Sequence, residues 1–404
     1  MSSQHIIVVG GGAAGLFAGI TCAETAPGNK VTILEQGPDF LAKVRISGGG
    51  RCNVTHACFD AREFATQYPR GGKELIGPLK RFGARDTVAW FKARGVKLNT
   101  ECDGCIFPLS NTSQTIIDCF LNAAQAAGVT LRSNCGVERI EDRFKLTLST
   151  GETISCDRLL LATGGCRSAA AGQLAVSLGH TLEPPVPSLF TFDLDTPWLR
   201  ELAGIVIEPV EASAQGLRER GTLLVTHTGL SGPVILRLSA WGARTLHDCN
   251  YKFSLLINWL PNLPVEEVAT ELQWRRSQQP GRLVVNTPIA PLPTRLWEQL
   301  VLAAGIARDT RWAVLPRAAM HRLTQQLIRT KLPVIGKSVN KEEFVTCGGV
   351  RLREVNFRTM ESRICPGLYF AGELLDIDSL TGGFNLQAAW TTGWIAGHAM
   401  VEAR

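Results

Sequence analysis

The feature that most constrains the fold is a glycine-rich turn between two apolar segments near the start of the chain. HIIVV, residues 5–9, is typical of a buried strand, and GGGAAG follows it at once. The next segment, LFAGITCAETA, has the small and apolar residues of a buried helix, and KVTILEQ, residues 30–36, predicts a second buried strand. Strand, turn, helix and strand form a βαβ unit, so we expect an α/β fold with a parallel, doubly wound sheet.

The turn itself has the spacing of a dinucleotide-binding site. Gly10, Gly12 and Gly15 form GxGxxG, in which the glycines allow a tight turn, approach of a pyrophosphate and close helix packing. Ala13 and Ala14 begin the helix, whose free N–H groups and positive dipole end favour an anion. Glu35 ends the second strand twenty residues after Gly15, where a carboxylate can accept the ribose hydroxyls of an adenosine. A carboxylate there disfavours a 2′-phosphate, so the pattern predicts FAD or NAD and not NADP.

Three later segments favour FAD over NAD. The chain has one GxGxxG fingerprint, whereas enzymes that hold both cofactors in such sites usually have two. LLLATGG, residues 159–165, and GLYFAGELLD, residues 367–376, are typical of strands that pass beside bound FAD, although Glu373 stands where Asp is commoner. TGGFNLQAAW, residues 381–390, begins the last helix with N–H groups that suit the flavin edge where negative charge collects on reduction. The candidate cofactor-binding residues of these segments are Thr163, Gly164, Gly165, Gly372, Glu373, Asp376, Gly382, Gly383, Asn385 and Leu386.

Within the stretch ISGGGRCNVTH, residues 46–56, the three glycines followed by Arg, Cys and Asn belong to no regular element, because glycine is unfavourable inside helices and strands. We interpret it as a close approach of the backbone to the cofactor, ten residues after the second strand. Its candidate cofactor-binding residues, with the cation that precedes them, are Lys43, Ser47, Gly48, Gly49, Gly50, Arg51, Cys52 and Asn53.

Composition narrows the class of protein. The chain has 404 residues, 45% of them hydrophobic, without a basic signal-peptide start or an apolar run long enough for a membrane span. Its 12 cysteines are dispersed and read as reduced thiols. Cys102 and Cys105 form one CxxC pair without a second pair, so we predict no metal site. A soluble, cytoplasmic protein is expected.

Two stretches carry an excess of positive charge. Residues 62–97 contain nine basic and three acidic residues, and residues 262–331 contain ten and five. They are either solvated helix faces or surfaces for the phosphates of RNA. Stacking on RNA bases would need exposed aromatic rings nearby. The rings considered for such stacking are Tyr68, Phe82, Trp90, Trp274, Trp297 and Trp312, which at helical spacing could equally form a core.

Longer motifs resemble one known family. ISGGGRCNVT, LLVTHTGLSGP (223–233), TCGGV (346–350) and the segment from Thr359 to Gly393 are similar to the BaiN-like, aminoacetone-oxidase-like FAD-dependent oxidoreductases, the bacterial YhiN group. The resemblance implies a Rossmann-like FAD-binding domain built from both chain ends, residues 1–186 and 347–404. It also implies an inserted small β-barrel, residues 187–262 with a return strand at 332–346, and a helical subdomain at 263–331. The prolines and glycines after residue 184 independently predict an antiparallel sheet or small barrel.

The resemblance further implies hydride transfer from NAD(P)H through bound FAD to an activated C=C bond, in an enone-like or uracil-type substrate. An acid must protonate the second carbon, and the candidates are Cys52, His56 and His227. Cys52 is equally interpretable as a small packing residue beneath the flavin. The alternatives are an enzyme that forms dihydrouridine in ribosomal RNA through the basic stretches, a flavin-binding RNA partner without turnover, and an O2-using oxidase of a small amine or amino ketone. The oligomeric state does not follow from the sequence.

Overall fold

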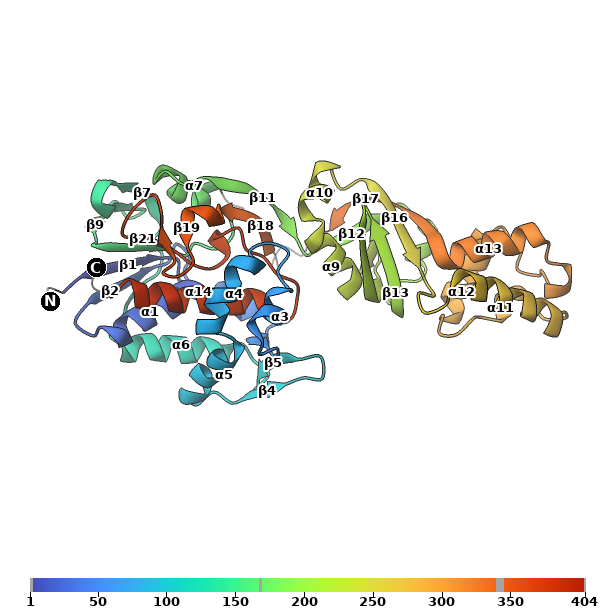
Figure 1. Cartoon of the computed structure of the whole chain (residues 1–404), viewed down its shortest axis with the longest axis horizontal. Coiled ribbons are helices and arrows are strands. Elements are labelled where there is room, and N and C mark those ends of the chain that lie inside the picture. Colours follow the sequence, from blue (N-terminus) through green and yellow to red (C-terminus); the bar gives the residue numbers. More distant parts are fainter. Residues whose placement is uncertain (1–2, 167–168, 339–344, 403–404) are drawn as a thin grey trace. The chain divides into compact units, whose positions relative to one another are not determined.

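The computed structural model describes residues 3–166, 169–338 and 345–402, and the chain divides into two compact units (Figure 1). Unit 1 comprises Met1–Ser188 and Asn340–Arg404, and unit 2 comprises Leu189–Val339. Each unit encloses its own cluster of buried hydrophobic residues. The predicted fold class, a doubly wound domain built from both chain ends with an inserted barrel, is therefore confirmed.

Unit 1 is built on a seven-stranded sheet whose first five strands are parallel. In spatial order these strands are β6 (Thr130–Arg132), β2 (Lys30–Leu34), β1 (His5–Val9), β10 (Arg158–Leu161) and β21 (Leu368–Phe370). The antiparallel strands β20 (Glu361–Ser362) and β19 (Val355–Asn356) extend one edge. The chain reverses its direction of winding between β1 and β10, and such a switch point opens a crevice for a ligand at the carboxyl ends of the strands.

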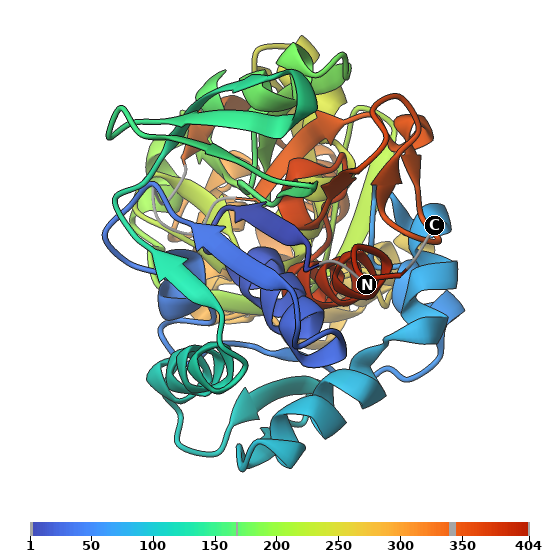
Figure 2. The same ribbon diagram turned by 90° about the vertical axis from the view of Figure 1, so that its left-hand side faces the viewer.

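Helices α1 (Ala13–Thr25), α14 (Phe384–Ala399) and α6 (Gln114–Ala126) lie on one side of this sheet (Figures 1 and 2). On the other side lie helix α7 (Ala169–Ser177) and a small antiparallel sheet of β7 (Val137–Glu141), β8 (Lys145–Leu148) and β9 (Thr153–Ser155). Strands β8 and β9 form a hairpin at Gly151, and β10 follows them and enters the parallel sheet.

Helices α1 and α14 pack at backbone distance. A Cβ atom on Gly393 would lie 2.5 Å from the carbonyl oxygen of Ala14, and one on Gly397 would lie 2.7 Å from that of Ala18. Because both contacts advance by four residues, the helices run parallel. Nine residues of α14 precede Gly393, whereas one residue of α1 precedes Ala14, a difference of eight residues. At a rise of 1.5 Å per residue, the start of α14 therefore lies about 12 Å beyond the start of α1.

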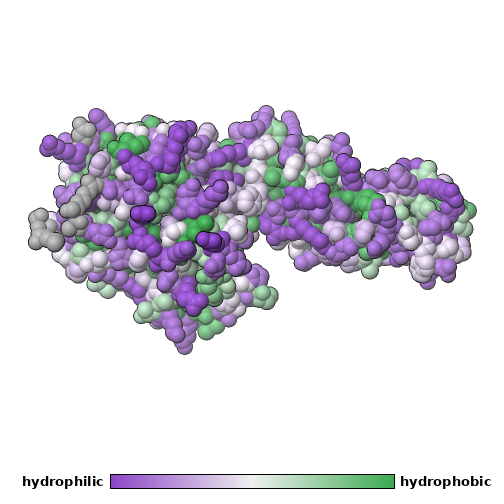
Figure 3. All heavy atoms as spheres, viewed as in Figure 1, coloured by the Kyte–Doolittle hydropathy of each residue, from purple (hydrophilic) through white to green (hydrophobic). Residues whose placement is uncertain are grey.

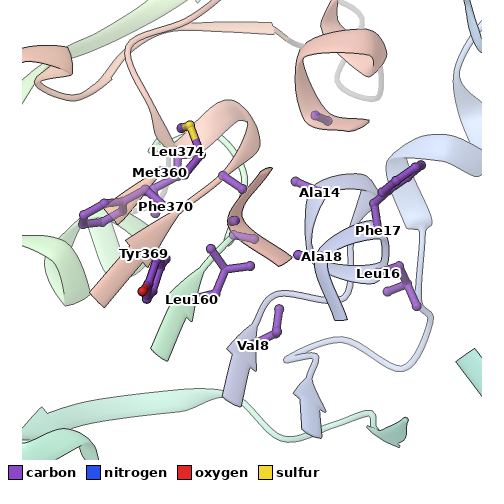
Figure 4. Packing of buried hydrophobic residues seen from close by; sticks show 14 of the residues in the cluster. Val8, Ala14, Leu16, Phe17, Ala18, Leu160, Met360, Tyr369, Phe370 and Leu374 are labelled. Atoms are coloured by element: carbon purple, nitrogen blue, oxygen red, sulfur yellow. The ribbon is translucent and has the colours of Figure 1, made fainter. Parts of the chain in front are cut away.

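The sheet presents one apolar row to these helices. Val8 on β1 pairs with Leu160 on β10, which pairs with Tyr369 on β21. Figure 4 shows these side chains together, with Ala14 and Ala18 projecting from α1. The Tyr369 hydroxyl donates to the carbonyl of Ala399 at the end of α14. Both chain ends therefore share one core.

The remaining elements of unit 1 connect and cover this frame. The sheet β3–β5–β4 consists of Thr55–His56, Cys105–Pro108 and Leu98–Thr100, and β11 (Leu182–Ser188) pairs with β18 (Val345–Val350). The helices are α2 (Ala42–Ile46), α3 (Ala61–Ala65), α4 (Gly72–Arg81) and α5 (Ala84–Ala93). Between α4 and α5 the chain turns at Phe82 and Gly83, where a Cβ on Gly83 would meet the Leu79 carbonyl at 2.6 Å.

Unit 2 is a closed six-stranded barrel with a helical insertion. Its strands are, in spatial order, β12 (Thr191–Leu194), β15 (Gly229–Ser231), β14 (Leu217–Val225), β13 (Val206–Ala214), β16 (Phe253–Asn258) and β17 (Thr330–Ser338). Helices α8 (Pro197–Arg200), α9 (Pro233–Trp241) and α10 (Ala243–Asp248) belong to the barrel part. Helices α11 (Val265–Gln278), α12 (Thr294–Ala303) and α13 (Arg317–Arg329) lie between β16 and β17 in sequence. Within the described ranges, no helix is long and apolar enough to cross a membrane.

Replacing Gly393 by Ala should lower the free energy of unfolding by about 1–3 kcal/mol, because the added methyl group meets backbone that cannot move without shifting α1. Urea unfolding of unit 1, followed by tryptophan fluorescence, measures the effect. The matched control is Gly28→Ala, an exposed turn position whose Cβ would meet no described atom within 4 Å. The control should unfold at or slightly above the wild-type midpoint. A Gly393→Ala protein as stable as the control would contradict the close contact of the two helices.

Candidate cofactor site

The carboxyl ends of the central parallel strands open into a pocket of about 210 Å³. The predicted residues Gly10, Gly12, Glu35, Lys43, Thr163 and Gly164 all line it. They come from the turns after β1, β2 and β10, which the parallel sheet brings to one edge. The pocket therefore lies at the switch point of the fold, where ligands of open α/β sheets bind.

The three glycines of the fingerprint have separate physical roles. Gly10 has φ +110°, and a Cβ there would lie 2.2 Å from the Ala162 carbonyl oxygen. A Cβ on Gly15 would lie 1.9 Å from the Gly10 carbonyl oxygen, so both positions are closed by protein backbone. A Cβ on Gly12 would meet no atom of the described residues within 4 Å, although Gly12 lines the pocket. The space beside Gly12 is thus a cradle of the kind that a pyrophosphate fills.

The start of α1 faces this cradle with its positive end. Gly12 is the N-cap residue, and no side chain of the described chain caps the helix or places an acid in its first turn. Ala13 and Ala14 follow, so the first N–H groups of the helix are not covered by bulky side chains. Such a helix start favours an anion through both its N–H groups and its dipole.

Glu35 is held in a fixed orientation at the end of β2. Its Oε2 accepts a hydrogen bond from the Gly11 N–H (2.7 Å) and its Oε1 accepts one from the Gly37 N–H (2.8 Å). A carboxylate oxygen has a second lone pair, so the half-buried group can still accept a hydroxyl. Its position fits the two hydroxyls of an adenosine ribose.

The two acids of the C-terminal motif bond to protein groups. Glu373 pairs with Lys43 at 2.5 Å and accepts the Thr346 N–H at 2.9 Å. Asp376 accepts the Gly348 N–H at 3.0 Å. Both acids therefore bond to the backbone of β18, and Glu373 also connects the C-terminal motif to α2 through Lys43. Gly372 packs against α1, because a Cβ there would lie 2.8 Å from that of Ala14.

The triple glycine forms a left-handed turn. Gly48, Gly49 and Gly50 have φ values of +57°, +66° and +82°, and the Cys52 N–H donates to the Ser47 carbonyl at 2.9 Å. A Cβ on Gly49 or Gly50 would meet no described atom within 4 Å, so this backbone borders open space.

The two polar side chains of this loop bond within the protein. The Ser47 hydroxyl donates to the Val44 carbonyl at 2.8 Å. The Arg51 guanidinium pairs with Glu101 at 2.7 Å and lies 3.9 Å from the centre of the Phe107 ring. Of the expected phosphate contacts from Lys43, Ser47 and Arg51, only Lys43 lines the pocket.

The four residues after Cys52 clamp the loop to α14. The Asn53 amide is oriented so that both its oxygen and its nitrogen form hydrogen bonds. The oxygen accepts the Gly383 N–H at 3.2 Å, and the nitrogen donates to the Thr55 and Ile106 carbonyls. The Val54 carbonyl accepts the Trp390 indole N–H at 2.9 Å, and the Thr55 hydroxyl donates to Gln387 Oε1 at 2.6 Å. His56 Nδ1 lies 3.2 Å from the Gly382 carbonyl oxygen, and its ring stacks on Phe384. We call residues 53–56 the clamp.

The start of α14 is shaped by two glycines and one amide. Gly382 and Gly383 have φ values of +124° and +89°, and a Cβ on Gly383 would lie 2.7 Å from the Thr55 carbonyl. The Asn385 side chain accepts the Ser379 N–H and donates to the Ser379 carbonyl, which orders the preceding turn. Leu386 is half-buried, and no described side chain caps the helix. Gly165, which follows β10, packs against β18, because a Cβ there would lie 2.5 Å from the Thr346 hydroxyl oxygen.

The three candidate acids have different surroundings. Cys52 is fully buried with φ +62°, and burial raises the pKa of its thiol to about 12, with a hydrogen bond to Ser47 opposing this. His56 is half-buried within the clamp. His227 is exposed in the turn between β14 and β15 of unit 2. The structure thus brings Cys52 and His56 into the loop and clamp, while His227 belongs to the other unit.

Most aromatic residues of the basic stretches are core residues. Tyr68 and Phe82 are buried, Trp90 stacks on Phe120, and Trp297 and Trp312 are fully buried. Trp297 donates its indole N–H to the Val284 carbonyl and Trp312 to the Thr287 hydroxyl. Trp274 is half-exposed and remains available for stacking.

Several pocket residues were not predicted from the sequence. The Gly11 N–H orients Glu35. Leu41 is a buried residue at φ +59°, and its N–H donates to the Gly11 carbonyl. Residues 135–137 form one wall of the pocket. The wall at 135–137 follows β6 closely, so the rule that parallel strands end at one edge could have indicated it. For Leu41 the sequence carries no such signal, because a left-handed leucine is set by tertiary contacts.

The chain resembles known proteins along its whole length. The family model described as "HI0933-like protein Rossmann domain" matches residues 4–399. The ribosomal RNA dihydrouridine synthase of Escherichia coli K12 is 31% identical over 417 residues, which cover 100% of both chains. The 3-dehydro-bile acid delta(4,6)-reductase of Clostridium scindens is 28% identical and covers 99% of both. A crystal structure of 3-ketosteroid delta1-dehydrogenase from Sterolibacterium denitrificans has a TM-score of 0.53 at 12% identity over 99% of both chains, which shows a shared fold.

Gly12→Val should abolish retention of a dinucleotide while the protein without cofactor keeps its wild-type melting temperature, because the new side chain projects into the cradle. Absorption of the purified protein and its thermal melt measure the two effects. Gly10→Val is the contrasting variant and should destabilise the fold, since its side chain meets the Ala162 carbonyl. Cofactor binding by Gly12→Val at wild-type affinity would show that the cradle is not the pyrophosphate site.

Cys52 should resist alkylation by iodoacetamide at pH 8 in the native protein, because its buried thiol stays protonated well below pH 12. Exposed Cys102 should react in the same sample and serves as the internal control. Peptide mass spectrometry after timed quenching gives both rates. Modification of Cys52 as fast as that of Cys102 would contradict its burial.

Proposed function

Because the chain belongs to the HI0933-like family of Rossmann flavoproteins, we propose that it is an FAD-dependent reductase that uses NAD(P)H to saturate a C=C bond conjugated to a carbonyl group. The acceptor that we propose first is a uracil base of ribosomal RNA. In the balanced reaction, NAD(P)H delivers a hydride to one carbon and a proton is added to the other, which leaves NAD(P)⁺ and a saturated bond.

The observation that carries this proposal is the chemistry shared by two relatives that match the chain end to end. Forming dihydrouridine adds two hydrogens to the C=C bond of uracil, and a delta(4,6)-reductase acts on C=C bonds of a steroid ring. The acceptors differ greatly in size, but both are electron-poor alkenes. The name of the 31% identical relative favours the RNA base, and a small enone is the second acceptor class.

The residues of unit 1 fit FAD as the cofactor. Gly12, the start of α1 and Glu35 would hold its pyrophosphate and adenosine ribose, for the reasons of space and charge given above. The start of α14 lies about 12 Å further in the same direction, beside the left-handed Gly49 and Gly50, and would hold the flavin end. When bound there, FAD supplies the two-electron chemistry that connects a hydride donor to an acceptor.

The start of α14 contributes electrostatically. Its uncapped N–H groups and dipole favour negative charge, and the clamp fixes their position through Gly382 and Gly383. Because these N–H groups are already held in place, little energy is spent on reorienting them when negative charge develops beside them. Gln387 is fully buried and accepts from both Thr55 and Thr87, which makes this end of the helix rigid.

For the proton we propose His56 over Cys52. His56 is half-buried and accessible to solvent, whereas the Cys52 thiol is enclosed and burial raises its pKa. Cys52 is then a packing residue whose small size allows the left-handed turn beneath the cofactor. His227 is proposed as a substrate-positioning residue of the barrel.

The whole function is tested by anaerobic reduction with NADH or NADPH followed by addition of acceptors. We expect the yellow colour of the purified protein to bleach with one of the two donors and to return with uridine-containing ribosomal RNA or with an enone. Mass spectrometry should find the RNA nucleoside heavier by two hydrogens. Return of colour only with O2, with release of peroxide, would support an oxidase instead and contradict the proposal.

His56→Ala should slow reoxidation by the C=C acceptor by about 10²–10⁴-fold and slow reduction by NADH far less, because only the second half-reaction needs an acid. Cys52→Ala should leave both half-reactions near the wild-type rates. Stopped-flow absorption separates the two steps. If Cys52→Ala slows reoxidation and His56→Ala does not, the acid assignment must be exchanged.

A further inference from the structure

A polar groove of about 590 Å³ lies on the outside of the barrel, away from its buried core. Its lining comes from the β13–β14 hairpin, β16 and the junction of α13 with β17. The lining includes three cations, Arg218, Arg329 and Lys331, and among the described residues that line it there is no acid. Figure 3 shows hydrophilic residues spread over the barrel strands on the face that it draws.

The cations are arranged by the register of the barrel. Arg218 pairs with Ser213, Ser213 with Leu256, and Leu256 with Lys331, so the four residues form one row across β14, β13, β16 and β17. Directly opposite residues point to the same face of a sheet. Three strand spacings separate the Cα atoms of the two cations by about 14 Å. The row therefore has a cation at each end, Arg218 and Lys331. The Ser213 hydroxyl and the Leu256 side chain lie between them.

The end of the row at Lys331 is held in position by the buried neighbour Thr330. Arg329 and Lys331 flank Thr330, which is 3% exposed and accepts the indole N–H of Trp259 at 2.7 Å. This contact turns Thr330 inward and leaves its two neighbours exposed. Neither Arg329 nor Lys331 forms an ion pair with a described residue, while Arg218 has a 3.4 Å contact with Glu211. The site thus presents cations on a rigid backbone.

The charge of the whole unit points in the same direction. Residues 189–339 contain 17 Lys and Arg against 12 Asp and Glu, a net charge of +5, out of +6 for the entire chain. Unit 2 therefore carries most of the net positive charge of the chain, which favours attraction of a polyanion.

We propose that this groove binds the phosphate backbone of the RNA substrate, an inference that rests on the proposed function. Cations about 14 Å apart suit a chain with several phosphates better than a single phosphate group. Ser213 and Ser254 add hydroxyl donors, as phosphate contacts commonly do. Among the described residues that line the groove there is no aromatic ring, so it positions the RNA without reading its sequence. An anionic membrane would need an exposed apolar anchor, whereas the apolar lining residues Ala214, Leu217 and Leu256 are buried or half-buried.

The test measures binding of a dye-labelled fragment of ribosomal RNA to the FAD-loaded protein by fluorescence anisotropy at several salt concentrations. The triple variant Arg218→Ala, Arg329→Ala, Lys331→Ala should bind at least about tenfold more weakly at low salt, with a log–log salt slope smaller by about two to three. A charge-conserving variant, Arg218→Lys, Arg329→Lys, Lys331→Arg, should retain most of the affinity. The matched control removes three cations of the helical insertion: Arg276→Ala, Arg282→Ala, Arg317→Ala.

Reduction by NADH and reoxidation by a small enone are measured on the same proteins and should be unchanged in the groove variant. Wild-type RNA affinity in the groove variant, or an equal loss of affinity in the control variant, would overturn the groove assignment. The reaction with the enone tests the proposed function separately. Equal binding of the wild type to anionic phospholipid vesicles or to polyglutamate would likewise overturn RNA as the partner. A wild type that binds RNA with a flat salt slope would exclude a phosphate site.

Discussion

The structure depends on the backbone-distance contact between α1 and α14. Gly393 and Gly397 let α14 approach Ala14 and Ala18 so closely that side chains at the glycine positions would collide with carbonyl oxygens. Because the helices are parallel, both direct their positive ends toward the carboxyl edge of the sheet, with a stagger of about 12 Å. The two ends of the chain thus supply two uncapped helix starts that favour anions, at a fixed offset from each other.

The clamp transmits this arrangement to the glycine loop. Each residue from Asn53 to His56 bonds to α14 or to the two residues before it, so the left-handed turn at residues 48–50 cannot move independently of the helix. Buried polar groups such as Gln387 and the Val54 carbonyl are costly when unpaired, which makes this packing specific. The contacts of the clamp thus join segments that are more than 300 residues apart in sequence.

Local rules were sufficient for the parts of the site that are made from one segment. The strand, turn and helix around Gly10–Gly15, and the acid at the end of β2, follow from spacing alone, and the structure places them in one pocket. Side-chain contacts between segments that are distant in sequence could not be predicted by such rules. Arg51 is occupied by Glu101 and Phe107, and Trp297 and Trp312 fill the core of unit 2, because charge and helical spacing do not specify a partner. Leu41 likewise adopts its conformation only through the folded turn.

The central claim is that both chain ends form one FAD site, and hydrogen–deuterium exchange with and without FAD tests it most directly. We predict that FAD slows exchange together in residues 10–16, 47–56 and 380–388, which share the site, and leaves the barrel strands of unit 2 unchanged. Protection confined to residues 10–16 and the end of β2, with 47–56 and 380–388 unaffected, would contradict a site shared by the two ends.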